Sequence, residues 1–255
     1  MVDTEIKNHI LYITINREEK LNALNAAVLD SLNLEILKIY TDTSIYGAII
    51  VGAGQKSFVA GADLEDIAAL NDQNAEYAAQ KGQNIFNLIE NSPKPIIAVV
   101  NGFALGGGCE LAMACHIRIA TENAIFAQPE VNYGIIPAYG GSQRLPKLIG
   151  KGRALEMIMT GNNMKANIAL NWGLVNYVLE SKEMALVKAE EILNKIFEKS
   201  PLSISYAIEC VNDGFKNNVD GYRSEVVLFS KCIVSDDFKV GTQAFIQKTK
   251  PVFKR

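Results

Sequence analysis

Hydrophobic residues follow two different periods in the first two thirds of the chain, and together they predict an α/β fold. Residues 9–15 alternate polar and apolar side chains, as a half-buried strand does. Over residues 26–40 the apolar positions recur at helical spacing, and Asn25 precedes them as the expected N-cap. The other elements predicted in this part are strands at 47–51, 95–100, 117–120 and 124–127, and helices that start at Asp63 and cover 75–91 and 109–115.

After residue 140 the pattern is almost entirely helical. Helices are predicted at 143–149, 153–160, 165–171, 182–199, 201–217, 221–230 and 235–248, and only 174–179 carries a strand signal. No low-complexity linker interrupts these segments. We therefore predict an α/β core over residues 1–199 and a helical C-terminal region over residues 200–255.

Composition and charge argue against several classes of protein. The chain has 255 residues, 49% hydrophobic and 21% charged, so it can bury a large core without disulfides. It has no run of about 18 apolar residues that could span a membrane, and its N-terminus lacks the regions of a signal peptide, so we expect a cytoplasmic protein. The net charge of −3 is spread along the chain without a basic stripe, which argues against nucleic-acid binding.

The cysteines form no recognisable metal or disulfide motif. Cys109, Cys115, Cys210 and Cys232 show neither a Cys-x-x-Cys pair nor a Cys/His cluster of zinc spacing. We expect free, buried thiols and no metal site.

Two turns could each present backbone N–H groups to an anion. Residues 101–110, Asn-Gly-Phe-Ala-Leu-Gly-Gly-Gly-Cys-Glu, run from a strand through glycines into a helix, whose unpaired N–H groups attract negative charge. The run lacks the spacing of a dinucleotide fold or a phosphate loop, and close packing of a strand against a helix explains it equally well. Residues 58–63 offer the Ala62 N–H near a second helix start, although Asp63 there is also typical of an ordinary helix start.

Glu110 and Glu130 are candidates for an acid/base pair. Two carboxyl groups with different environments can add water across a polarised double bond, one delivering a proton and the other activating water. A lone glutamate is usually a solvated surface acid, and that alternative holds for each residue taken singly. Glu110, however, lies between Cys109 and Leu111 on the helix that follows the glycine turn, where burial would raise its pKa.

These motifs resemble the enoyl-CoA hydratase (crotonase) family, and its bacterial short-chain members in particular. The resemblance covers nearly the whole chain. The matching segments follow the family's order and lie at residues 16–25, 57–64, 95–111, 126–130, 140–145 and 173–176.

The resemblance implies a crotonase (ClpP/crotonase-like) α/β fold, a spiral of ββα repeats with a helical C-terminal region for trimerisation. It implies a homotrimer or a dimer of trimers, and an acyl-CoA thioester as substrate. No metal and no cofactor are implied, since CoA is part of the substrate.

The resemblance also assigns roles to individual residues. The backbone N–H groups of Ala62 and Gly107 would hold the thioester oxygen. Glu130 would supply or remove the C2 proton, and Glu110 would polarise the water that adds at C3. The residues implied in CoA binding are Lys20, Ala23, Ala60, Asp63 and Leu64, with Lys248, Lys250 and Lys254 as candidates for its phosphates.

The activity implied is reversible syn addition of water to a short-chain trans-2-enoyl-CoA, giving a 3-hydroxyacyl-CoA. The alternatives are an isomerase, decarboxylase or thioester hydrolase of the same family, or a catalytically silent CoA-binding scaffold. Both glutamates are present, whereas members that resemble isomerases generally keep only the equivalent of Glu130. The chain departs from the family pattern at Ala138, where glycine is usual, at His116, where Asp is usual and a surface or capping role is expected, and at the bulky Tyr139, which bears on acyl-chain length.

Overall fold

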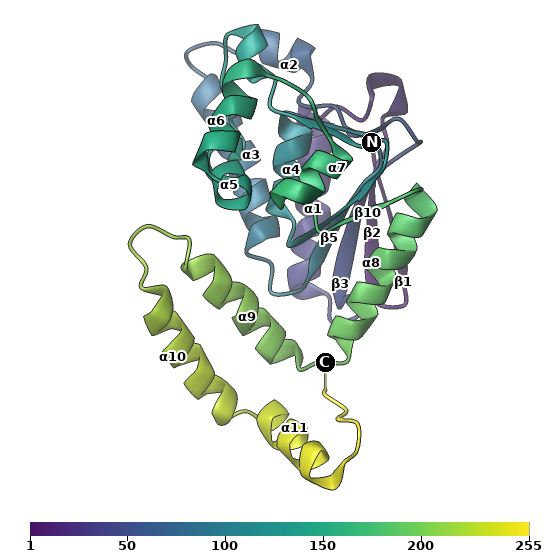
Figure 1. Ribbon diagram of the computed structural model, residues 1–255, viewed down its shortest axis with the longest axis vertical. Helices are drawn as coiled ribbons and strands as arrows, with labels where there is room; N and C mark the ends of the chain where they lie inside the picture. Colours follow the sequence, from purple (N-terminus) through teal and green to yellow (C-terminus); the bar gives the residue numbers. More distant parts are fainter. Residues whose placement is uncertain (255) are drawn as a thin grey trace.

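The computed structural model describes residues 1–254, which form a two-sheet α/β body and three C-terminal helices (Figure 1). The larger sheet has the order β1 (Val2–Lys7), β2 (Ile10–Ile15), β3 (Gly47–Gly52), β5 (Ile96–Val100), β7 (Ile117–Thr121) and β10 (Tyr177–Leu179). The smaller sheet has the order β4 (Ser57–Val59), β6 (Phe103–Leu105), β8 (Ile125–Ala127) and β9 (Met164–Lys165). Neighbouring strands are parallel except in the pairs β1–β2 and β8–β9.

A repeated strand–strand–helix unit builds this body. In each unit the first strand joins the larger sheet, the second joins the smaller sheet, and a helix follows. The helices that follow the three units are α2 (Leu64–Ala68) with α3 (Ala75–Glu90), α4 (Gly107–Ala114), and α5 (Gly141–Ile149). This arrangement confirms the predicted α/β class. Strands β4 and β6 were not predicted, because three residues are too few to show a period.

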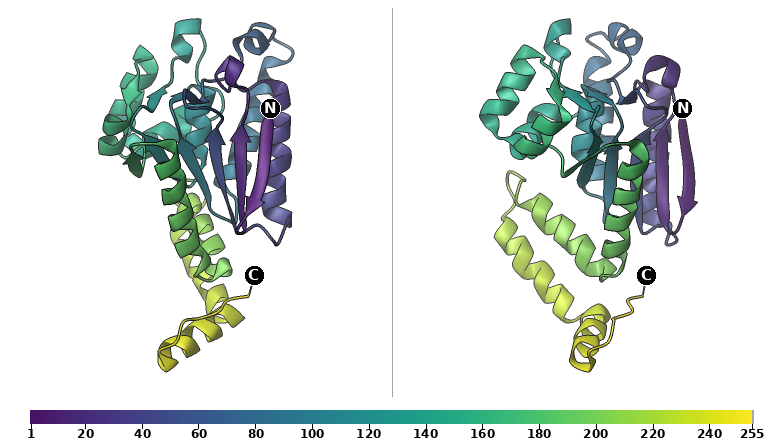
Figure 2. Two further views of the ribbon diagram at one scale, coloured as in Figure 1. Left: turned by 90° about the vertical axis from the view of Figure 1, so that its right-hand side faces the viewer. Right: turned by 45° about the vertical axis from the view of Figure 1, so that its right-hand side comes forward.

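The larger sheet is covered on both faces, which explains its apolar runs. Ala48 and Ile50 of β3 face a core shared with α1 (Ala26–Thr41), α3 and α4. Ile49 and Val51 face the opposite core, which is completed by α8 (Lys182–Phe197). Figure 2 shows α1 and α8 on opposite sides of the sheet. Side chains that alternate between two buried faces give a continuous hydrophobic segment rather than an alternating one.

The N-terminal boundary differs from the prediction at one hairpin. The strand predicted over residues 9–15 begins at Ile10, because Asn8 and His9 have φ of 51° and 65° and form the turn. The preceding strand β1 lies at the sheet edge with mostly exposed side chains, and it was not predicted. The predicted N-cap is confirmed, since Asn25 Oδ1 accepts a hydrogen bond of 2.9 Å from the Val28 N–H.

The C-terminal helices project from the body (Figure 1). They are α9 (Pro201–Asp213), α10 (Gly221–Ile233) and α11 (Asp236–Gln247), and the remaining helices α6 (Lys151–Thr160) and α7 (Ala166–Trp172) belong to the body. The predicted division at residue 199 falls between α8 and α9 and stays a prediction. Within residues 1–254, no helix is long and apolar enough to cross a membrane.

Candidate active site

A cavity of about 490 Å³ lies among α2, α3, α4 and the loop that follows the short helix η2 (Glu130–Tyr133). Most of its lining is apolar. It brings together six of the residues predicted for the site, which are Ala60, Ala62, Leu64, Gly107, Glu110 and Glu130. Segments distant in sequence therefore converge on one apolar cavity that contains two carboxyl groups.

Ala62 and Gly107 present adjacent backbone N–H groups to this cavity. Gly107 is the first residue of α4, so its N–H has no acceptor within the helix. A methyl group added to Gly107 would lie 3.4 Å from the Ala62 nitrogen. The neighbouring Asp63 N–H, rather than that of Ala62, bonds to the Leu24 carbonyl at 2.8 Å. Among the described residues neither the Ala62 nor the Gly107 N–H has an acceptor, so both can bind an oxyanion.

The adjoining glycines allow two other segments to approach α4 closely. A methyl group on Gly108 would lie only 1.9 Å from the Val59 carbonyl oxygen, so α4 packs directly on β4 there. Gly106 has a φ of 48°, and a methyl group on it would lie 2.7 Å from Glu130 Oε1. Both interpretations of the glycine run therefore hold: Gly108 serves close packing, and Gly107 presents a free N–H.

Glu110 is held by two backbone N–H groups in a buried position. Its side chain is on α4, and the residue is 1% exposed. Its Oε1 accepts hydrogen bonds from the Tyr139 N–H at 2.8 Å and from the Gly141 N–H at 2.6 Å. Burial raises the pKa of Glu110 to about 7, although these two hydrogen bonds oppose the rise. A carboxyl group with this pKa can exchange a proton near neutral pH.

Glu130 supplies the second carboxyl group. It begins η2 and is half-buried, and its burial raises the pKa of the carboxyl group. Its Oε2 is buried and has no hydrogen-bond partner among the described residues. A buried carboxylate oxygen without a partner is costly, so this atom is available to a substrate group. The charge of Glu130 also contributes to the raised pKa of Glu110.

Three of the residues predicted to bind CoA do not line the cavity. Asp63 caps α2 by accepting the Glu65 N–H at 3.0 Å, and it pairs with Arg17 Nη1 at 2.7 Å. The hydrogen bond from Arg17 lowers the pKa of Asp63, so this carboxylate is ionised and already has partners within the protein. Lys20 pairs with Glu65 at 3.0 Å, and the Ala23 carbonyl accepts from Arg17 at 3.2 Å. For Asp63 the helix-start interpretation is therefore the one that the structure supports.

The C-terminal lysines do not reach the cavity of their own chain. Helix α11 and the segment after it lie at the opposite end of the molecule from α2 (Figure 1). Lys248 caps α11, Lys250 pairs with Glu198 at 2.5 Å, and Lys254 lies by Tyr46 and Pro95. The contact expected between these lysines and CoA phosphates therefore stays a prediction.

The three departures from the family pattern have structural explanations. Ala138 is not among the residues with positive φ, so its Cβ is tolerated. Tyr139 lines the cavity, and its ring packs edge-on against Phe86 with the centroids 5.5 Å apart. A methyl group on Gly82 would lie 2.2 Å from the same ring. The Nδ1 of His116 accepts the N–H of Ile96, the first residue of β5, at 2.9 Å, so His116 binds a strand end and does not cap a helix. Burial lowers the pKa of this partly buried side chain to about 4.

Two groups of contacts were missed from the sequence. The Tyr139 and Gly141 N–H groups that bind Glu110 come from a turn that was noted only as a family motif. Gln128 is fully buried, and its Nε2 donates to the Gly106 carbonyl at 3.2 Å, which supports the glycine turn. For the N–H groups that bind Glu110, the glycine pair before a helix start was an available signal in the sequence. For the contact of Gln128 with Gly106, a single Gln gave no signal.

The raised pKa of Glu110 makes stability depend on pH in a predictable direction. The folded protein keeps the Glu110 proton up to about pH 7, whereas the unfolded chain loses it near the ordinary value of 4.5, so stability falls between these values as the pH rises. The loss amounts to about 3 kcal/mol above pH 7. The side chain of the variant Glu110→Gln cannot ionise. Its free energy of unfolding, relative to that of the wild type, should therefore rise by about this amount between pH 4.5 and pH 8. Denaturant unfolding across this range measures it, and a difference independent of pH would contradict the assignment.

Comparison with known proteins is informative over the whole chain. The sequence profile described as "Enoyl-CoA hydratase/isomerase" matches residues 5–255. The chain is 43% identical over 249 residues to the short-chain-enoyl-CoA hydratase of Clostridium acetobutylicum, covering 96% of this chain and 94% of that protein. It is 41% identical over 254 residues to the crotonyl-CoA hydratase of Syntrophomonas wolfei, covering 99% of this chain and 96% of that protein.

Solved structures agree with these sequence matches. The crystal structure of enoyl-CoA hydratase from Bacillus anthracis is similar with a TM-score of 0.92 and 37% identity, and covers 99% of this chain and 98% of that chain. The fold predicted from the family resemblance is confirmed. Within residues 1–254, no group of three or more His, Cys, Asp or Glu side chains could hold a metal ion.

Proposed function

The chain belongs to the enoyl-CoA hydratase/isomerase family, and we propose that it adds water reversibly, in syn fashion, across the C2=C3 bond of a short-chain trans-2-enoyl-CoA. The product is a 3-hydroxyacyl-CoA. One observation carries the proposal: Glu110 and Glu130 line the same cavity as the free N–H groups of Ala62 and Gly107. The reaction uses no cofactor or metal, since CoA is part of the substrate.

Each group has a distinct role in this reaction. The Ala62 and Gly107 N–H groups bind the thioester oxygen and stabilise the enolate that forms on it. Ionised Glu110 takes a proton from the water whose oxygen bonds to C3, and protonated Glu130 gives a proton to C2. The net change is one added water, and the proton on Glu110 returns to Glu130 through solvent. Removal of water is the same sequence in reverse.

The CoA moiety is proposed to lie where two segments meet at the cavity edge. Ala60 and Leu64 line the cavity itself. Lys20, Ala23 and Asp63 lie beside it on segments joined by the hydrogen bond from the Leu24 N–H to the Gly61 carbonyl. Of these, Lys20 has an ammonium group that is exposed enough to bind a CoA phosphate. Its ion pair with Glu65 would break when it does so.

The packing of Tyr139 favours short acyl chains. Its ring occupies the space beside Gly82 and Phe86, so a long chain has no room to extend there. The relatives in Clostridium acetobutylicum and Syntrophomonas wolfei are named for short-chain and crotonyl substrates. The isomerase alternative has less support, because migration of a double bond does not need the second carboxyl group that activates water.

A series of acyl-CoA substrates tests this function. We expect kcat/KM for hydration to be highest with trans-2-butenoyl-CoA and to fall as the acyl chain lengthens. The loss of absorbance of the conjugated thioester measures the rate of hydration. Lack of hydration of trans-2-butenoyl-CoA, together with turnover of a 3-enoyl or malonyl-type thioester, would refute the proposed function in favour of another reaction of the family.

We also propose that the chain assembles as a homotrimer or a dimer of trimers. The support is the projecting C-terminal region, where Tyr222, Phe229 and Phe245 are 87%, 65% and 86% exposed. Apolar surface of this kind marks an interface. Sedimentation equilibrium should give three or six times the chain mass of 27.9 kDa, and a monomer at micromolar concentration would contradict this assembly. The cytoplasmic location stays a prediction.

A further inference from the structure

We propose that Arg144 is a positioning residue for catalysis: its buried guanidinium fixes the turn at residues 139–141, and this turn orients the Glu110 carboxylate toward the water that adds to C3. The inference rests on the proposed hydration reaction. Arg144 does not line the cavity, so it acts through the turn and not on the substrate.

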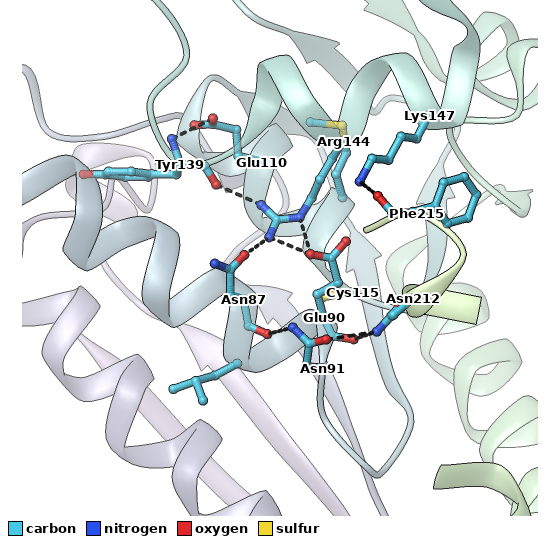
Figure 3. Close-up of polar contacts among 12 residues, drawn as sticks. Asn87, Glu90, Asn91, Glu110, Cys115, Tyr139, Arg144, Lys147, Asn212 and Phe215 are labelled. Atoms are coloured by element: carbon cyan, nitrogen blue, oxygen red, sulfur yellow. Dashed lines mark hydrogen bonds and ion pairs between the residues drawn. The ribbon is translucent and has the colours of Figure 1, made fainter. Parts of the chain in front are cut away.

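The guanidinium of Arg144 is held on one side by helix α3. The residue is on α5 and is 6% exposed. Its Nε and Nη2 donate to Glu90 Oε2 at 3.1 and 2.8 Å, and Nη2 also donates to Asn87 Oδ1 at 2.7 Å (Figure 3). These hydrogen bonds to two side chains of a 16-residue helix give the guanidinium one orientation.

The other side of the guanidinium holds the turn. Arg144 Nη1 donates to the Tyr139 carbonyl at 2.9 Å, and the Tyr139 N–H donates to Glu110 Oε1 at 2.8 Å (Figure 3). The Gly141 N–H donates to the same oxygen at 2.6 Å. Three consecutive peptide units are thus fixed between a buried cation and the catalytic carboxylate.

Gly140 allows the Arg144 guanidinium to approach this turn closely. It has a φ of 107°, and a methyl group on it would lie 2.2 Å from Arg144 Nη1. Glycine is therefore needed both for this φ and to let the guanidinium approach, and the Gly140 carbonyl itself accepts the Arg144 N–H at 2.9 Å. Without the Arg144 side chain the Tyr139 carbonyl loses its hydrogen-bond partner. The two N–H groups would then no longer be held toward Glu110.

A further contact ties this network to the C-terminal helices. Asn212 of α9 donates through Nδ2 to the backbone carbonyl of Glu90 at 2.7 Å (Figure 3). The chain of contacts therefore runs from α9 through Glu90, Arg144 and Tyr139 to Glu110. Arg144 therefore links α3, and through it α9, to the turn at residues 139–141, which contacts Glu110 in the active site.

Arg144 also affects the charge of Glu110. Its positive charge lowers the pKa of Glu110 and so opposes the rise due to burial. Removing that charge should make Glu110 harder to ionise. The pH dependence of hydration therefore distinguishes a positioning residue from one that only stabilises the fold.

The test compares Arg144→Met with Arg144→Lys and with Lys147→Met as a matched control. Lys147 is on the same helix, but its ammonium group donates to the Phe215 carbonyl at 3.2 Å. For Arg144→Met we expect kcat for trans-2-butenoyl-CoA to fall about 10- to 100-fold, as for a displaced catalytic group. The KM and the affinity for unreactive butyryl-CoA should stay within about twofold, and the acid limb of the kcat/KM profile should move to higher pH. Lys147→Met should match the wild type in all these measurements.

Arg144→Lys separates charge from geometry. It keeps a positive charge but cannot bond to α3 and the turn as a planar fork, so kcat should fall several-fold while the acid limb moves less than in Arg144→Met. If Arg144→Met does not yield folded protein, Arg144→Lys carries the test, and an unchanged kcat overturns the proposal. An Arg144→Met protein with wild-type kcat, or with reduced kcat but an unmoved acid limb, also overturns it. Failure of the wild type to hydrate the substrate would instead refute the proposed function.

Discussion

Replacing Glu110 by Gln should lower kcat for hydration of trans-2-butenoyl-CoA by about 10²- to 10⁴-fold, the range for a general acid or base. Gln still offers an Oε1 to the Tyr139 and Gly141 N–H groups, so the site should keep its shape. What it loses is the ability to take a proton from water. The affinity for butyryl-CoA should therefore stay within about twofold.

Glu130→Gln is expected to have an effect of similar size, because it removes the proton delivered to C2. The two losses should combine to less than their product, since both groups act in one reaction step. Steady-state kinetics and calorimetric titration with butyryl-CoA measure the two quantities separately. A variant that keeps kcat and loses affinity would show that the glutamates bind CoA and do not transfer protons.

Gly107→Pro should lower kcat by about 10²- to 10³-fold, the effect of removing one oxyanion donor. Gly107 is the first residue of α4, where proline is well tolerated because the N–H has no acceptor within the helix. The substitution therefore removes the donor to the substrate while α4 retains its hydrogen bonds. Circular dichroism and the affinity for butyryl-CoA check that the fold and the CoA site are intact.

Gly107→Ala is the matched control for this prediction. Its added methyl group would lie 3.4 Å from the Ala62 nitrogen and 3.4 Å from the Tyr139 ring, which is ordinary contact or close to it. The variant keeps the N–H, so its kcat should stay within a few-fold of the wild type. Equal losses for alanine and proline would mean that crowding, and not the missing donor, lowers the rate.

Much of the fold could be predicted from local patterns. The long helices show a regular hydrophobic period and the strands buried on both faces are continuous apolar runs, so their existence was clear from the sequence. The pairing of β3 with β5 and of β5 with β7 could not be derived from those patterns. The family resemblance implied a spiral of ββα repeats but not these pairings, because the order of strands in a sheet is set by contacts between distant segments.

The parts that were missed share a physical cause. Strands β4 and β6 are too short to show a period, and β1 is an exposed edge. The contacts of Glu110 with Tyr139 and of Arg144 with Glu90 join residues 29 and 54 positions apart in the sequence. Both depend on how α3, α4 and α5 pack together. Candidate catalytic groups were therefore visible in the sequence, whereas the residues that orient them were not.

The most direct test of the central claim follows oxygen from labelled water. The wild type is incubated with trans-2-butenoyl-CoA in H₂¹⁸O, and the products are analysed by mass spectrometry beside those of Glu110→Gln. The account predicts one ¹⁸O at C3 of 3-hydroxybutyryl-CoA for the wild type, and formation of this product at least about 100-fold more slowly for the variant. Label in a free carboxylate, which indicates thioester hydrolysis, or equal rates for the two proteins, would contradict it.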